Sequence, residues 1–130
     1  MSLNSRRLLT DAIKYFRKIM NKHEKVARVK FVESDRHKAI FEILLKDERV
    51  LNTYIADVYI LTAADVREIV SEYEDVDCIV VVSNWDHYTL DAKNIAKEMK
   101  IGVFTLKEFM GAINNNGKRF LETGTANATE

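Results

Sequence analysis

Apolar positions in the first half of the chain change from a helical period to a strand period. Between residues 5 and 21 they recur at spacings of three and four, which predicts an amphipathic helix. From Lys25, apolar residues alternate with basic ones as far as Phe31, the pattern of a half-buried strand. Two more strands are predicted by AIFEILLK and VLNTYIADVYIL, at residues 39–46 and 50–61. Because the connections are short, we expect these three strands to be antiparallel neighbours.

The second half of the chain predicts helices that alternate with buried strands. Each of the three helices begins with a threonine N-cap, at Thr62, Thr89 and Thr105. The segment CIVVVS, at residues 78–83, shows no polar alternation, so we expect a strand that is covered on both faces. The short apolar segment IGVF, at residues 101–104, predicts the fifth strand.

The order of these elements defines the fold class. A helix and three meandering strands are followed by helix, strand, helix, strand and helix, which is the order αβββαβαβα. This order predicts an α/β protein with an α+β start, in which helices flank a mixed five-stranded sheet. We expect one domain over residues 1–114 and a mobile polar tail over residues 115–130.

Composition places the chain among soluble globular proteins. It has 130 residues, enough for one domain, of which 47% are apolar and 31% are charged. No apolar run approaches the roughly 20 residues that span a bilayer, so we expect a cytoplasmic protein without a membrane partner. Cys78 is the single cysteine, and we expect it to be a small buried apolar residue.

The net charge is zero, but the charges are unevenly distributed. Residues 1–32 contain nine basic and two acidic residues, whereas acidic residues are concentrated between residues 47 and 77. A basic segment of this kind can bind the phosphates of DNA or RNA. The residues expected at such a face are Arg6, Arg7, Lys14, Arg17, Lys18, Arg28 and Lys30. Alternatively, the basic face is solvated, or it pairs with the acidic half of the same subunit or of a second subunit in a homodimer.

Residues 58–113 contain a succession of features that is known from one group of enzymes. A helix leads to an apolar strand ending in serine, a short loop reaches an aromatic residue and a threonine, and a helix with spaced alanines precedes a strand with a glycine. The residues that carry these features are Ser83, Tyr88, Thr89, Ala92, Ala96 and Gly102. This succession resembles the part of Mrr-type nucleases that follows their active-site strand. The resemblance, together with the element order, implies a restriction-endonuclease-like fold.

The resemblance also implies a catalytic motif, which this chain lacks in part. Such nucleases hold Mg²⁺ between an acid on the second strand and an acid-x-Lys motif on the third. Here the third predicted strand has Asp57 without a lysine two residues later. The second has Glu42 and Lys46, which are four residues, or about 13 Å, apart. Glu42, Lys46 and Asp57 are therefore weak catalytic candidates.

Two hypotheses about catalysis follow from the incomplete motif. We favour a catalytically degenerate nuclease-fold domain, without a cofactor, that acts in nucleic-acid binding or in homo-oligomeric assembly. The alternative is an active Mg²⁺-dependent endonuclease with a displaced site, which uses a lysine from elsewhere in the chain.

The loop after residue 82 provides a third hypothesis. Residues 83–87 include the serine, aspartate and histidine of a hydrolase triad, but a triad needs its groups on separate elements. The loop instead follows the carboxyl end of an interior strand, where ligands of such sheets often bind. The residues expected to stack on a base or to pack against a partner are Asn84, Trp85, His87 and Tyr88. The loop could equally sense a small ligand or a protein, or Trp85 could fold over the edge of the sheet.

Overall fold

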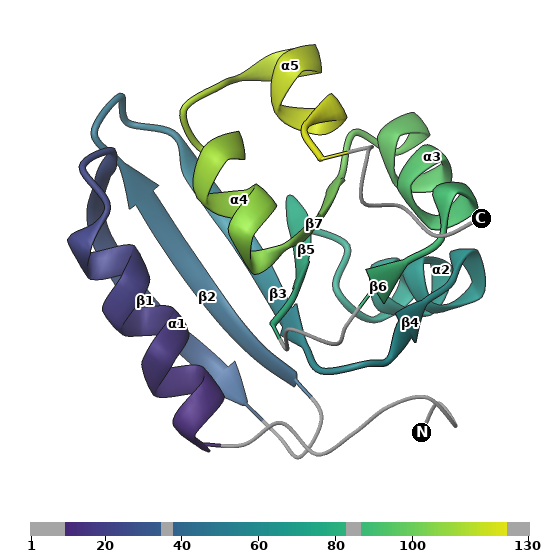
Figure 1. Ribbon diagram of the computed structural model, residues 1–130, viewed down its shortest axis with the longest axis horizontal. Helices are drawn as coiled ribbons and strands as arrows, with labels where there is room; N and C mark the ends of the chain where they lie inside the picture. The colour runs from purple at the N-terminus through teal and green to yellow at the C-terminus, as the bar shows by residue number, and fades with distance from the viewer. Residues whose placement is uncertain (1–9, 35–37, 83–86, 125–130) are drawn as a thin grey trace.

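Five strands form one mixed sheet in the computed structural model, which describes residues 10–34, 38–82 and 87–124 (Figure 1). The strands are β1 (Val26–Ser34), β2 (Lys38–Leu45), β3 (Val50–Ala56), β5 (Cys78–Val81) and β7 (Gly102–Thr105). They lie in the order β1-β2-β3-β5-β7. The β1–β2 and β2–β3 pairs are antiparallel, whereas the β3–β5 and β5–β7 pairs are parallel. This arrangement confirms the predicted mixed five-stranded sheet.

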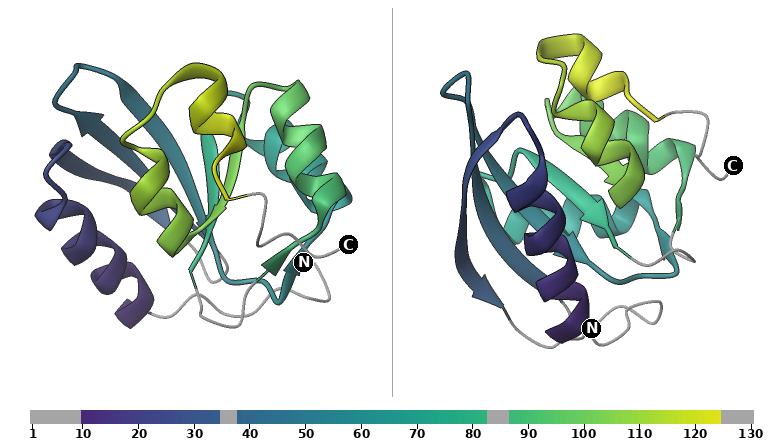
Figure 2. Two further views of the ribbon diagram at one scale, coloured as in Figure 1. Left: turned by 45° about the horizontal axis from the view of Figure 1, so that its top comes forward. Right: turned by 60° about the vertical axis from the view of Figure 1, so that its left-hand side comes forward.

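Helices cover both faces of this sheet (Figure 2). The helices are α1 (Thr10–Lys22), α2 (Ala63–Glu72), α3 (Leu90–Glu98), α4 (Leu106–Ala112) and α5 (Gly117–Glu122). Buried residues of α1, α4 and α5 pack on one face, and those of α2 and α3 pack on the other. Within the described ranges, no helix combines the length and the apolar character that a membrane span requires.

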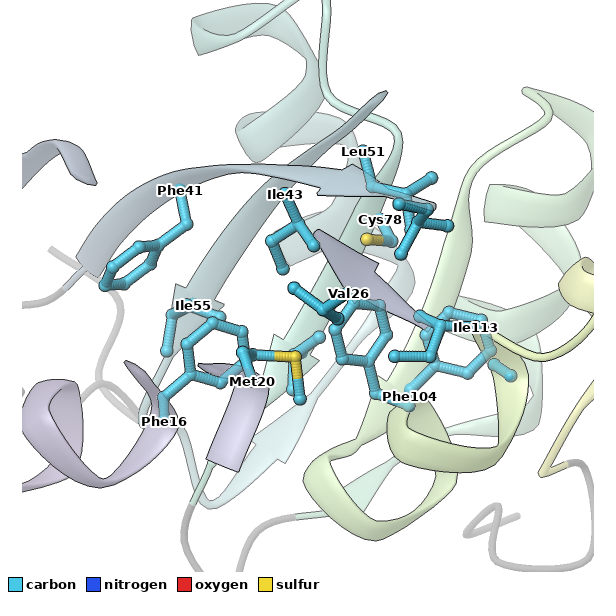
Figure 3. Packing of buried hydrophobic residues seen from close by; sticks show 14 of the residues in the cluster. Phe16, Met20, Val26, Phe41, Ile43, Leu51, Ile55, Cys78, Phe104 and Ile113 are labelled. Atoms are coloured by element: carbon cyan, nitrogen blue, oxygen red, sulfur yellow. The ribbon is translucent and has the colours of Figure 1, made fainter. Parts of the chain in front are cut away.

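The core under α1 and α4 is rich in aromatic residues (Figure 3). The ring centroid of Phe16 in α1 lies 5.2 Å from that of Phe41 and 6.2 Å from that of Phe109. Phe41 and Ile43 face this core because every second side chain of β2 points to the same side of the sheet. Cys78 is buried in the same cluster, as the sequence predicted, and this burial raises the pKa of its thiol to about 12.

Threonine caps begin three of the helices, as the sequence predicted. Thr62 Oγ1 accepts from the backbone N–H of Asp65 at 3.2 Å, and the Asp65 carboxylate accepts from the backbone N–H of Thr62 at 2.9 Å. Thr105 and Glu108 form a second capping box at α4, and Thr89 caps α3. Each cap satisfies backbone donors that the first helical turn leaves without partners.

The third predicted strand, residues 50–61, is divided in the structure. β3 ends at Ala56, and the apolar residues that follow form a separate strand, β4 (Ile60–Leu61). β4 pairs in parallel with β6 (His87–Tyr88), and the backbone N–H of His87 donates to the carbonyl of Tyr59 at 2.9 Å. The hydrophobic pattern missed this division because the partner of β4 comes from a distant part of the chain.

The described end of the chain also differs from the predicted mobile tail that begins at residue 115. Residues Gly117–Glu122 form α5, and Phe120 is only 6% exposed, with its ring centroid 5.0 Å from that of Phe104. A buried aromatic side chain therefore helps to anchor a segment whose average composition is polar. The packed domain extends to Gly124, and residues 125–130 of the predicted tail lie outside the described residues.

Candidate functional site

The parallel strands β3, β5 and β7 end at one edge of the sheet, which we call the carboxyl edge. Their register places Ala56, Val81 and Thr105 side by side there. β2 begins at the same edge, because Lys38 pairs with Ala56. The amino-terminal end of α1 also lies at this end of the sheet (Figures 1 and 2). Ligands of open α/β sheets usually bind outside the carboxyl ends of the strands.

Two exposed rings project at the carboxyl edge from the β4–β6 pair. Tyr59 is 53% exposed, and its ring lies edge-on to the ring of His87, with 6.2 Å between the ring centroids. His87 is also exposed. We call this pair the Tyr59–His87 ledge. Its two backbones are joined by the hydrogen bond between His87 N–H and Tyr59 carbonyl, so the rings are held on a paired scaffold.

The recognition loop predicted from the sequence is only partly at this ledge. His87 is part of it, whereas Asn84 and Trp85 lie outside the described residues. Tyr88 requires a correction, because it is fully buried and its ring is not available for stacking on a ligand. Neighbouring residues of a strand point to opposite faces, so the exposed His87 is followed by a buried Tyr88.

Tyr59 is the ledge residue that the sequence-based prediction missed. It falls inside the stretch that was assigned to one continuous strand, where an aromatic residue indicates packing. The signal that could have identified it is the polar Asp57, which interrupts the apolar pattern two residues earlier. Such an interruption is typical of the end of a strand.

The exposed face of α1 carries the first group of predicted basic residues. Lys14, Arg17 and Lys18 are exposed, together with Tyr15, which is 58% exposed. The Arg17 guanidinium lies 5.7 Å from the ring centroid of Phe31 on β1, a distance at which a cation and an aromatic face attract each other. Arg6 and Arg7, also predicted for this face, lie outside the described residues.

Arg28 and Lys30 do not lie on the α1 face. They pair in register with Leu44 and Glu42 of β2, so their side chains share the sheet face that α2 and α3 cover elsewhere. α1 packs against the opposite face. The structure therefore divides the predicted basic residues between the exposed face of α1 and the opposite face of the sheet, at the edge strand β1.

The weak catalytic candidates are distributed along the sheet. Glu42 lines a hollow of about 490 Å³ on the face with α2, and its register partner on β3 is Asn52. Asp57 is five residues beyond Asn52, about 17 Å along the strand. Lys46 follows the other end of β2. In the described part of the chain, no group of three or more histidine, cysteine or acidic residues could hold a metal ion.

Lys38 is the lysine of β2, the strand that carries Glu42, but its ammonium is bound to other groups. Its ammonium bonds to the Glu72 carboxylate and lies 4.3 Å from the ring centroid of Tyr73. Burial disfavours the charged form, but the hydrogen bonds to Glu72 and Tyr73 outweigh this effect and raise the pKa of Lys38. Lys38 therefore remains charged and bound to α2.

A buried polar cluster lies behind the ledge, between α3, α4 and the described end of the chain. Lys93 is 0% exposed, and its ammonium donates to the carbonyls of Val103 at 2.5 Å and Thr123 at 2.6 Å. The Tyr88 hydroxyl donates to the Glu108 carboxylate at 2.9 Å and also contacts the carbonyl of Gly124. Burial lowers the pKa of Lys93 to about 8, although the nearby Glu108 opposes this shift.

No protein-family model, curated protein or solved structure matches this chain. The arrangement of the described residues is therefore what indicates function. Two exposed features stand out among them: the Tyr59–His87 ledge near the carboxyl edge, and the basic face of α1, whose amino-terminal end lies at the same end of the sheet.

Proposed function

We propose that this domain is a catalytically degenerate member of the restriction-endonuclease-like fold that binds nucleic acid at its carboxyl edge. The observation that carries this proposal is that an exposed aromatic pair and the amino-terminal end of an exposed basic helix lie at the same end of the sheet. One feature can stack on bases, and the other can contact phosphates.

The fold supports the proposal through its element order. The helix, the three-stranded meander and the later parallel strands occur in the order expected for this fold. The segment that resembles Mrr-type nucleases, residues 58–113, contains β4, α2, β5, β6, α3, β7 and α4.

The charge of α1 supports contact with phosphates. Residues 12–22 contain no acidic residue, and Lys14, Arg17 and Lys18 are exposed. Positions four apart lie on one face of a helix, so Lys14 and Lys18 point in the same direction. A nucleic acid that neutralises these charges would release bound counterions, which makes the affinity depend on salt.

The β3 residues beside Glu42 support a domain without the nuclease motif. Beside Glu42, β3 presents Asn52 and Tyr54 where an acid-x-Lys pair would be needed. An amide and a phenol supply neither the second carboxylate for a divalent cation nor a lysine for the attacking water.

Binding of a fluorescently labelled single-stranded oligonucleotide, measured by anisotropy, tests the proposal. With three cations in contact, we expect the logarithm of the binding constant to fall with the logarithm of salt concentration with a slope of about −2. A Lys14→Glu/Lys18→Glu variant should show a clearly smaller slope. Tyr59→Ala should weaken binding about fivefold or more, because each stacked base contributes about 1–3 kcal/mol.

Lys100→Glu/Lys118→Glu is the matched control. Lys100 and Lys118 are exposed and line a hollow that includes no residue of α1 or of the Tyr59–His87 ledge. This variant should therefore bind like the unmodified protein. A folded protein that shows no binding at low salt would contradict the proposal. Plasmid cleavage in Mg²⁺ that is lost in Glu42→Ala and Asp57→Ala would instead support the active nuclease.

A further inference from the structure

We propose that Thr123 and Gly124 form a C-terminal latch over Lys93 and Tyr88, and that its opening presents the Lys93 ammonium to nucleic acid behind the Tyr59–His87 ledge. The latch itself is inferred from the buried polar cluster. Its link to nucleic acid rests on the proposed function.

The latch occupies its site through backbone carbonyls. The Thr123 carbonyl accepts from Lys93 Nζ at 2.6 Å, and the Gly124 carbonyl accepts from the Tyr88 hydroxyl. The Thr123 hydroxyl is directed back into α5, where it donates to the Arg119 carbonyl at 2.9 Å. A displacement of the backbone would therefore free one Lys93 N–H, while Lys93 keeps its bond to the Val103 carbonyl and the Tyr88 hydroxyl keeps its bond to Glu108.

Gly124 is fitted to this site in two ways. Its φ angle is +89°, a conformation that residues with a side chain rarely adopt. A Cβ atom at this position would also overlap the Glu108 carboxylate. A residue with a side chain at position 124 would therefore be strained in the latched position, and it would have to displace either the latch or the Glu108 carboxylate.

The burial of Lys93 indicates a functional role in addition to holding Thr123 in place. An apolar side chain could fill this space without the cost of removing an amine from water. A fully buried lysine with lowered pKa is a marker of a functional site when a cluster of polar groups surrounds it. Here Lys93 Nζ also lies 4.2 Å from the ring centroid of Phe104.

The position of the cluster connects it to the ledge. Tyr88 follows His87 directly in β6, so the buried cluster lies behind the exposed ring, on the opposite face of the strand. In the closed state Lys93 is bound to neutral carbonyl oxygens, whereas the Tyr88 hydroxyl also donates to the Glu108 carboxylate. The Glu108 carboxylate remains beside them and would repel a phosphate. The open site therefore suits the carbonyl oxygens of bases better than the backbone of the nucleic acid.

Acetylation of lysines, followed by mass spectrometry, tests the latch in the full chain. In the native protein, Lys93 should react far more slowly than Lys118, whose side chain is 85% exposed. Gly124→Ala should raise the rate at Lys93 about five- to tenfold, because a residue with a side chain is strained at this backbone angle. Gly111→Ala is the matched control, since a Cβ there meets nothing within 4 Å, and it should leave the rate unchanged.

A second measurement separates latch opening from global unfolding. Cys78 is fully buried, so its alkylation reports global unfolding. In the unmodified protein, Lys93 should become reactive at urea concentrations at which Cys78 is still protected. If Lys93 and Cys78 respond to urea in parallel, or if Gly124→Ala leaves Lys93 protected, the latch is overturned.

Oligonucleotide binding tests separately whether opening of the latch promotes the binding of nucleic acid. Gly124→Ala should bind the oligonucleotide about threefold or more tightly, since opening no longer competes with binding. If Lys93 becomes reactive while the affinity stays the same, the latch stands and its role in binding falls. If the unmodified protein binds no oligonucleotide, the proposed function fails, while the acetylation result still decides whether the latch exists.

Discussion

Lys93 places an amine inside the protein, where its charged form lacks the solvation of water. Two backbone carbonyls, of Val103 and Thr123, accept hydrogen bonds from it. Burial nevertheless lowers its pKa from 10.5 to about 8. Because the unfolded chain binds the Lys93 proton more tightly, the stability of the folded state should depend on pH.

We expect the free energy of unfolding to rise with pH relative to a Lys93→Met variant. Between about pH 8 and pH 10.5, the unfolded chain keeps the Lys93 proton that the folded chain has lost, so the folded state gains stability. The gain is at most about 3 kcal/mol. Urea denaturation of both proteins at pH 7.5, 9 and 10.5 measures it, and titration of the other residues cancels in the difference. A difference that stays constant with pH would contradict the lowered pKa.

Two neighbouring residues of β6 show that the alternation of side chains along a strand decides which of them is exposed. His87 and Tyr88 are adjacent in the sequence, and both were predicted to contact a ligand. In the structure one is exposed and the other is buried against Glu108. Composition cannot distinguish them, because the choice of face depends on the pairing of β6 with β4.

At the scale of elements, two glycines occupy contrasting positions. Gly102 begins β7, where a Cβ atom would overlap the ring of Phe104. Gly111 lies on the exposed side of α4, where a Cβ atom has open space. The same substitution should therefore have opposite effects at the two positions.

Gly102→Ala should lower the free energy of unfolding by about 1–3 kcal/mol, because the buried ring of Phe104 cannot move aside without strain. Gly111→Ala should raise it by up to about 1 kcal/mol, because alanine has the lower entropy cost in a helix. Urea denaturation of the two variants measures both effects. Equal changes of the same sign would show that the close approach at Gly102 is absent in solution.

At the scale of the whole molecule, α5 completes the core on the face with α1 and α4. Phe120 packs on Phe104, and the carbonyls of Ile113 and Asn115 accept from Arg49, which fixes the connection between α4 and α5. The described domain therefore includes a segment whose polar composition predicted a tail.

Phe120→Ala should destabilise the domain by about 3 kcal/mol, a typical loss for a buried aromatic residue. Phe31→Ala is the matched control, because Phe31 is 40% exposed on the edge strand and should lose clearly less. Both values come from urea denaturation. A loss below about 1 kcal/mol at Phe120 would mean that the chain is effectively a tail from residue 115 onward.

The candidate site was predictable only in part. The sequence identified His87 and the basic positions of α1, because loop position and charge are local properties. It could not place Tyr59 at the carboxyl edge, nor separate Arg28 and Lys30 from Lys14 and Arg17. The position of Tyr59 depends on where β3 ends, and the separation of the basic residues depends on the face of the sheet on which each one lies.

The sequence by itself determined the order of the first four helices and of the five strands of the main sheet, the mixed character of that sheet and the starts of α2, α3 and α4. Hydrophobic period and threonine caps act within a few residues, so one sequence is sufficient to show them. Only the tertiary structure decided the pairing of β4 with β6, the packing of Phe120 and the covering of Lys93 by Thr123 and Gly124. These features join segments that are distant in the chain, and their energies depend on contacts that no local pattern contains.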